Sequence, residues 1–280
     1  MTSKATDQTY LSTRQYQDAT NLNARIVIHA RFSVNPYGWH RWVFDQWDLP
    51  ANARILELGC GSGALWERNA ERIPSGWDLT LTDFSPGILA DARRTLSALP
   101  RAFAFAITDA QALPFADAAF DAVVANHMLY HIPDKPKAFA EIRRVLKAGG
   151  CLYAATNGMA HMQELYALER QVLMASAKTQ DIDLGQIVPA HSSFVLENGH
   201  EQLAPFFESI KERCYEDGLR VTEVEPLIAY VFSGIASADI GEAALEALRR
   251  HLTDELARTG AITITKAAGM FIALKSQNAA

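Results

Sequence analysis

Short apolar runs alternate with segments of helical periodicity through the middle of the chain. Five of these runs have the length of buried strands, at residues 54–58, 79–82, 103–107, 120–125 and 151–155. Helical patterns separate them, and one begins at Ser85-Pro86, a capping residue followed by proline at the first helical position. Asp134 is a second candidate cap. Strands that alternate with helices predict a doubly wound parallel sheet with helices on both faces.

The alternation stops on either side of this segment. A helical pattern runs from Leu22 to Phe32, and a short aromatic helix is expected from Trp39 to Trp47. After Thr156 no clear strand follows until about residue 205, although His161 to Met174 has helical spacing. Long insertions of this kind commonly cover a ligand. Strand-like runs return at 211–215 and 270–274, with a helical pattern at 242–257 between them.

These patterns divide the chain into four parts. We expect an N-terminal helical cap at 1–50, a Rossmann-like core at 51–156, a cap insertion at 157–205, and a C-terminal completion of the sheet at 206–280. The predicted fold class is therefore α/β, with a Rossmann-like sheet and a helical cap.

Charge and cysteine content narrow the setting. The 280 residues carry 26 Lys plus Arg against 32 Asp plus Glu, a net charge of -6, which argues against nucleic acid as the main partner. The three cysteines form no CxxC pair, so we expect a reducing compartment. No apolar run approaches the roughly 20 residues that span a bilayer, and the N-terminus lacks an apolar signal region. We expect a cytoplasmic protein without a membrane partner.

A glycine turn is the sharpest motif. The run 55–58 leads directly into Gly59-Cys60-Gly61-Ser62-Gly63. Three glycines after a buried strand allow a tight turn and a close approach of backbone to a ligand. Asp83 stands twenty residues after Gly63, at the end of the second strand, where a carboxylate can accept both hydroxyls of a ribose. Taken alone, Asp83 could equally be a turn residue before the Ser85 cap.

Glu57 distinguishes between cofactors that use such a turn. A dinucleotide would place its pyrophosphate near this carboxylate, and the negative charges would repel; a cofactor with an ammonium group fits better. Glu57 could instead cap backbone N–H groups of the turn. A nicotinamide-dependent oxidoreductase remains an alternative, although none of the eight tyrosines is followed by lysine four residues later.

Asp109 follows the third strand and can accept a hydrogen bond from an adenine amino group. The fourth strand is followed by Asn126-His127-Met128-Leu129-Tyr130-His131. Together with the glycine turn and Asp83, these residues resemble the class I S-adenosylmethionine-dependent methyltransferases, in particular the small-molecule branch of ubiquinone and menaquinone biosynthesis. The resemblance covers roughly residues 52–156. It departs at Ala148, a loop position where the family commonly has proline.

The resemblance implies a seven-stranded sheet with one antiparallel strand, and S-adenosyl-L-methionine as cofactor, with S-adenosyl-L-homocysteine as its product. It also implies contacts at named positions. Gly59, Cys60 and Gly61 would approach the methionine part, with Glu57 near its ammonium. Asp83 would take the ribose, and Phe84 would line the adenine. The adenine edge would meet Asp109 and Ala110, and the Asn126 backbone would lie near the sulfonium.

The same resemblance implies methyl transfer to a small-molecule acceptor by in-line displacement, in which alignment supplies much of the rate. His127 lies where the methyl should point and is the candidate base or orienter, with Tyr130 as its neighbour. His131 is interpreted as a structural turn residue. A non-catalytic cofactor-binding protein would show the same cofactor motifs and stays open.

Several other residues are weaker candidates. Tyr37 or Trp39 could wall the acceptor pocket, and Arg25 or Arg31 could meet the methionine carboxylate. Further histidines lie in the insertion, at 161, 191 and 200. They could line a pocket, although each is interpreted first as a surface or structural residue. No metal-binding spacing is present in the sequence.

Overall fold

The computed structural model describes residues 27–175, 190–234 and 242–277. Within these residues, seven strands form one sheet in the order β3-β2-β1-β4-β5-β7-β6. The strands are β1 (Arg54–Leu58), β2 (Asp78–Asp83), β3 (Ala104–Ile107), β4 (Phe120–Asn126), β5 (Leu146–Asn157), β6 (Ser209–Val221) and β7 (Ile262–Leu274). β6 is an edge strand of this sheet.

Strand direction matches the prediction. The pairs β1–β2, β1–β4, β2–β3 and β4–β5 are parallel. β7 runs antiparallel to both of its neighbours, β5 and β6. β7 is therefore the one strand of reversed direction, and the Rossmann-like sheet of seven strands with one antiparallel strand is confirmed.

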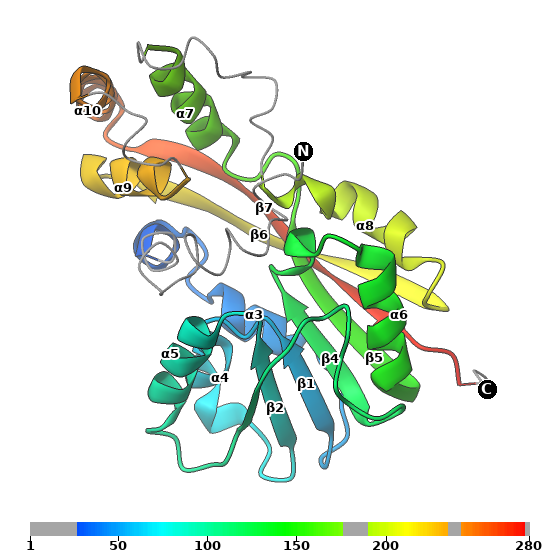
Figure 1. The fold of residues 1–280 in the computed structure, drawn as a ribbon. Helices are drawn as coiled ribbons and strands as arrows, with labels where there is room; N and C mark the ends of the chain where they lie inside the picture. The colour runs from blue at the N-terminus through cyan, green and yellow to red at the C-terminus, as the bar shows by residue number, and fades with distance from the viewer. Residues whose placement is uncertain (1–26, 176–189, 235–241, 278–280) are drawn as a thin grey trace.

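Helices cover both faces of the sheet (Figure 1). The described helices are α3 (Trp39–Asp45), α4 (Ala64–Arg68), α5 (Pro86–Leu96), α6 (Lys135–Val145), α7 (Gln163–Ala175), α8 (Leu196–Leu203), α9 (Val224–Gly234) and α10 (Glu242–Thr259). Side chains of α3, α4 and α5 pack on one face, and those of α6 and α8 pack on the other. Successive strand residues point to opposite faces, so each face receives its own apolar set.

Two helix starts confirm the capping predictions. The Ser85 hydroxyl accepts a hydrogen bond from the Ile88 N–H at 3.3 Å, at the start of α5. The Asp134 carboxylate accepts one from the Lys137 N–H at 3.0 Å, at the start of α6. Each cap satisfies an N–H group that the helix itself leaves without a partner.

β6 and β7 extend beyond the rest of the sheet. The first residue of β7 that pairs with β5 is Ala268, so residues 262–267 pair with β6 alone, opposite residues 216–221. We call this two-stranded segment the distal ribbon. The sequence predicted strands only at 211–215 and 270–274, because exposed charged residues interrupt the apolar pattern of β6.

A third apolar core forms on the distal ribbon. Leu219, Val221 and Ile264 pack there against residues 27–32, which are helical, and against α7, α9 and α10. Figure 1 shows α7, α9 and α10 gathered around this end of the ribbon, away from α4 and α5. We call this region the cap. The part of the predicted 22–32 helix before residue 27 lies outside the described residues.

The segment after residue 32 is tied to the edge of β6. Ser33 forms an isolated antiparallel bridge with Leu219, and the Val34 N–H donates to the Gly218 carbonyl at 2.9 Å. The Asn35 N–H donates to Asp217 at 2.9 Å. The N-terminal part of the cap is therefore fixed to the distal ribbon by backbone hydrogen bonds.

Candidate functional site

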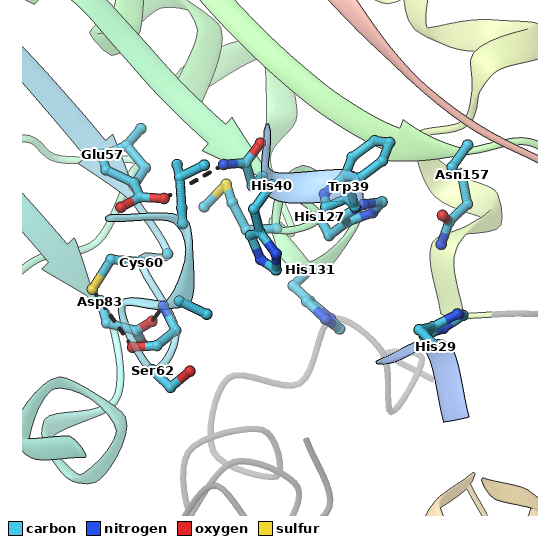
Figure 2. A pocket seen from close by; sticks show the side chains of 18 of the residues that line it. His29, Trp39, His40, Glu57, Cys60, Ser62, Asp83, His127, His131 and Asn157 are labelled. Atoms are coloured by element: carbon cyan, nitrogen blue, oxygen red, sulfur yellow. Dashed lines mark hydrogen bonds between the residues drawn. The ribbon is translucent and has the colours of Figure 1, made fainter. Parts of the chain in front are cut away.

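A cavity of about 820 Å³ opens between the carboxyl ends of the parallel strands and the cap. This volume lies toward the upper end of the range of about 300–1,000 Å³ that is usual for ligand pockets. All eleven site residues expected from the sequence line it: Glu57, Gly59, Cys60, Gly61, Asp83, Phe84, Asp109, Ala110, Asn126, His127 and Tyr130. Figure 2 shows Glu57, Cys60 and Asp83 at one end of this space.

The glycine turn has the backbone that glycine allows. Gly59, Gly61 and Gly63 have φ values of 66°, 56° and 81°. A Cβ atom on Gly59 would lie 2.8 Å from the Met128 Cβ atom, so the turn also needs glycine there for space. The turn thereby exposes its backbone to the cavity.

Glu57 is a buried carboxylate beside the turn. The Trp66 indole N–H donates to Oε2 at 2.6 Å, and the Asn126 amide donates to Oε1 at 3.5 Å. Burial raises the pKa of Glu57 to about 7, and the nearby charge of Asp83 adds to the rise. Both donors are side chains from outside the turn, so these contacts differ from the backbone cap that was one interpretation of Glu57.

Asp83 is held by the backbone of its surroundings. Its two oxygens accept from the N–H groups of Gly61 at 3.2 Å and Ser85 at 2.9 Å. Burial raises the pKa of Asp83 to about 6, against the effect of these donors. Two buried carboxylates in one cavity favour a cationic or hydroxyl-bearing ligand, because either would stabilise the charged form.

Asn126 adds an acceptor to this group. Its Oδ1 atom is buried and has no hydrogen-bond partner among the described residues, and the side chain lines the cavity. An orphaned acceptor costs free energy until a donor reaches it. A ligand ammonium near Glu57 and Asn126 would supply that donor, so these residues fit the amino-acid part of S-adenosylmethionine.

The expected adenine end is partly organised in advance. The Asp109 carboxylate accepts from the Gln111 backbone N–H at 2.9 Å and from its side-chain amide at 3.0 Å. Gln111 in turn accepts from the Asp134 N–H at 3.1 Å. Phe84 is 42% exposed, and its ring is available to cover a flat ligand.

His127 stands between this end and the cap. Its φ of 51° is unusual for a residue with a side chain, and its N–H donates to the Ala155 carbonyl at 3.0 Å. The imidazole lies 5.0 Å from the Trp39 ring, centroid to centroid. Figure 2 shows His127 and Trp39 side by side in the middle of the pocket. A strained backbone at a cavity wall is typical of functional positions.

Tyr130 and His131 follow on the 3₁₀ helix η3 (Leu129–His131), with ring centroids 4.6 Å apart. Both line the cavity, although the sequence interpretation of His131 was structural. Tyr37 and Trp39 also line the cavity, and the sequence had suggested either of them as a wall of the acceptor pocket.

The cap end of the cavity brings together residues of which only His161 was a candidate from the sequence, and a weak one. His29 and His161 are stacked with ring centroids 6.0 Å apart, and Tyr230 meets His29 edge-on at 6.5 Å. Lys266 lines the same end. These residues lie far apart in the sequence and belong to no motif, so their grouping becomes visible only in the fold.

Some weaker candidates lie elsewhere. Arg31 forms an exposed ion pair with Glu223 and does not line the cavity. His200, on α8, is also absent from the lining. Arg25 lies outside the described residues, as does the side chain of His191. His40, which was not predicted, lines the cavity, and burial lowers its pKa to about 4.

The described part of the chain contains neither a candidate metal site nor a helix able to span a membrane. It contains no group of three or more His, Cys, Asp or Glu side chains placed to hold a metal ion. Across residues 27–175, 190–234 and 242–277, no helix combines the length and apolar character needed to cross a bilayer.

Comparisons with known proteins agree with the motifs. A family model described as "Methyltransferase domain" matches residues 56–154. A demethylmenaquinone methyltransferase of Thermus thermophilus is 41% identical over 114 residues, which cover 41% of this chain and 51% of the relative. A malonyl-[acyl-carrier protein] O-methyltransferase of Geobacter sulfurreducens is 38% identical over 121 residues, which cover 43% of this chain and 45% of the relative. The chain thus matches about half the length of these curated relatives.

Among solved structures, phosphoethanolamine N-methyltransferase 2 of Haemonchus contortus, in complex with S-adenosyl-L-methionine, superposes with a TM-score of 0.59. It is 20% identical and covers 96% of this chain and 60% of its own. At this identity the likeness concerns the fold. Residues 56–154 therefore match the methyltransferase domain, and the chain resembles the class I S-adenosylmethionine-dependent methyltransferases of ubiquinone and menaquinone biosynthesis.

Proposed function

We propose that this protein transfers a methyl group from S-adenosyl-L-methionine to a small-molecule acceptor. The observation that carries the proposal is that one cavity joins the buried carboxylates at the strand ends to the imidazole of His127 and the aromatic wall of Trp39. A cationic cofactor and its acceptor can therefore share one enclosed space. The matched methyltransferase domain supports the same activity.

The residues at the strand ends fit the cofactor. Glu57 and the Asn126 side chain would hold its ammonium, and Asp83 would accept from the ribose hydroxyls. The backbone of the glycine turn would lie along the methionine part, with Phe84, Asp109 and Ala110 around the adenine. When bound, the cofactor supplies a methyl group already activated by a positively charged sulfur.

His127 would act on the acceptor. Its backbone is fixed to Ala155 and its ring rests beside Trp39, so the imidazole has a defined place in the cavity. If the attacking atom carries a proton, His127 would take it; if not, the ring would orient the acceptor for in-line attack. Tyr130 lines the cavity on the neighbouring turn and would complete this wall.

The alternatives receive less support. A nicotinamide cofactor would bring its pyrophosphate close to the Glu57 and Asp83 carboxylates, and negative charges placed together in this part of the cavity would repel each other. A non-catalytic binding protein would use the same strand-end residues. It would not require a histidine held at positive φ beside the cap.

Calorimetry and turnover test the proposal in two stages. S-adenosylhomocysteine should bind to the purified protein much more tightly than NADH. Incubation with S-adenosylmethionine and a pool of small metabolites should then release S-adenosylhomocysteine. Tighter binding of NADH would reject the cofactor assignment, whereas cofactor binding with no turnover on any pool would favour the non-catalytic alternative.

A further inference from the structure

The acidic side chains of the cavity lie at its strand end. The acidic side chains among the described lining residues are Glu57 in β1, Asp83 at the end of β2, and Asp109 just after β3. The basic and imidazole side chains of the lining are His29, His40, Arg41, Arg68, His127, His131, His161 and Lys266. Figure 2 shows the two ends, with Glu57 and Asp83 on one side, His29 and Asn157 on the other, and His127 between them.

Lys266 is the buried cation of the cap end. It forms an ion pair with Asp217, directly opposite on the distal ribbon, and the two side chains are 7% and 0% exposed. Burial lowers the pKa of Lys266, and the Asp217 carboxylate opposes this by favouring the ammonium. An ammonium has three donors, of which the bond to Asp217 uses one.

Asp217 does not present its charge to the cavity. Besides Lys266, it accepts from the Ser33 hydroxyl and from the N–H groups of Asn35 and Gly218, the last two at 2.9 and 2.8 Å. It is absent from the cavity lining, whereas Lys266 is part of it. The carboxylate is thus held by donors outside the lining, and Lys266 is the charged residue of the pair that lines the ligand space.

Three separate segments, β7, the loop after β5 and the 27–32 helix, carry N–H donors to the cap end of the cavity. The loop after β5 is fixed on both sides of it, because Gly158 donates to the Ala267 carbonyl at 2.9 Å and Met162 to the Thr265 carbonyl at 2.8 Å. That loop carries His161, which stacks on His29 from the 27–32 helix. Each imidazole carries at least one N–H in either protonation state.

Trp39 connects this group to the reaction centre. Its ring lies 5.0 Å from His127 on one side and 5.3 Å from Tyr215 on the other, and the Lys266 ammonium lies 5.5 Å from the centre of the Tyr215 ring. An acceptor resting on Trp39 can therefore extend from His127 toward Lys266. Of these two aromatic residues Trp39 lines the cavity, and Tyr215 lies behind it, outside the lining.

We propose that the methyl acceptor carries an oxyanion, a carboxylate or a phosphate, that binds at Lys266, His29 and His161. Its methyl-accepting atom then points along Trp39 toward His127. This inference rests on the proposed function and adds the substrate class. A positively charged acceptor, or one without charge at that end, would leave the ammonium of Lys266 facing an apolar or like-charged group at a cost in binding.

Matched probes test the charge requirement. The protein is first saturated with S-adenosylhomocysteine, and then titrated with benzoate against benzamide and with phenyl phosphate against phenol. The anionic member of at least one pair should bind about ten-fold or more tightly than its neutral partner, and the pair that does so distinguishes carboxylate from phosphate. Equal binding within both pairs overturns the proposal.

Variants locate the effect. Lys266→Met should weaken binding of the preferred anion by about 10- to 100-fold, the range for a lost hydrogen bond to a charged group, and leave the neutral partner unchanged. Lys211→Met, an exposed lysine on the paired strand β6, is the matched control and should change neither. If Lys266→Met fails to fold, Asp217→Asn with Lys266→Met removes both charges of the buried pair and should give the same loss.

Cofactor affinity distinguishes the proposed methyltransferase function from the proposed anion site. S-adenosylhomocysteine should bind the Lys266 variants as tightly as the wild type, because its residues lie at the other end of the cavity. Failure of the wild type to bind it would reject the proposed function. Normal cofactor binding with unchanged anion binding in the Lys266 variants would reject the anion site alone.

Discussion

The two ends of the cavity differ in how their residues are encoded. The strand-end half is built from residues between Glu57 and His131, which lie at the carboxyl ends of neighbouring parallel strands. The cap half draws on residues as far apart as His29 and Lys266. The relatives from Thermus thermophilus and Geobacter sulfurreducens match over little more than a hundred residues, and their names give different acceptors. The segment shared with these relatives includes the strand-end half, so under our proposal the cap half would set the acceptor.

The two halves also rest on different cores. The strand ends are supported by the two apolar clusters on either face of the sheet, whereas the cap has its own cluster on the distal ribbon. Residues of the third core should therefore affect acceptor binding and stability more than cofactor binding. The following experiments test how far that separation extends.

The largest effect is expected in the third core. Leu252 on α10 is 1% exposed, so Leu252→Ala should lower the free energy of unfolding by about 2–5 kcal/mol through lost burial and a cavity. Denaturant titration measures this, with the exposed neighbour changed in His251→Ala as control. Cofactor affinity of the folded variant should stay at the wild-type value. A loss of cofactor binding comparable to that of an Asp83 variant would show that the two halves are not separable.

Turnover should depend next on His127. We expect His127→Asn to reduce turnover by about 100-fold or more if the acceptor must lose a proton, with cofactor affinity unchanged. Asparagine tolerates the positive φ of this position better than alanine does, which limits backbone effects. Any dependence of turnover on pH that the imidazole imposes should disappear. His200→Ala, outside the cavity, is the control, and full activity of His127→Asn with an unaltered pH profile would contradict a base role.

A smaller loss is expected at Asp83. Removing its carboxylate in Asp83→Ala should weaken S-adenosylhomocysteine binding by about 10- to 100-fold, since hydrogen bonds to a charged group are worth about 1.5–3 kcal/mol. Asp78→Ala, at the exposed start of the same strand, should have no effect on the affinity. Calorimetry provides the test. An unchanged dissociation constant in folded Asp83→Ala would mean that the carboxylate serves only the turn.

The smallest expected effect comes from protonation of Glu57. Without ligand, the pKa of Glu57 is raised to about 7. This group therefore contributes folding stability that is fully present below about pH 4.5 and is lost as the pH rises through 7. A ligand ammonium favours the ionised form, so cofactor affinity should rise about ten-fold from pH 6 to pH 8. Glu57→Gln should remove this slope. Calorimetry at both pH values measures it, and an equally steep slope in Glu57→Gln would assign it to another group.

The strand-end half was predictable because its chemistry is local. An apolar run, a glycine turn and a carboxylate at the next strand end each carry a meaning within a few residues, as at Gly59 and Asp83. The Ser85 cap follows from one residue and the proline beside it. Parallel strands then bring such ends to one edge of the sheet, so their grouping needs no further information.

The cap half was not predictable for the opposite reason. Lys266 becomes part of a site only through the register of β6 and β7, which places it opposite Asp217. The negative charge of Asp217 is also stabilised by hydrogen bonds from Ser33 and Asn35, because the segment after residue 32 returns to the edge of β6. The length of β6 was missed because its outward residues are charged. A lone histidine such as His29 has no pattern that separates a pocket residue from a surface one.

The exposed border of β6 has a consequence for self-association. An edge strand of 13 residues offers backbone groups to which another chain could add, which is a route to aggregation. Here Lys211, Glu212 and Arg213 place alternating charges along the exposed part, and Glu216 adds another. The far end is occupied by the bridge from Ser33 and the hydrogen bond from Val34. The segment that completes the cap thus also blocks one end of the border, and charge discourages strand addition along the rest.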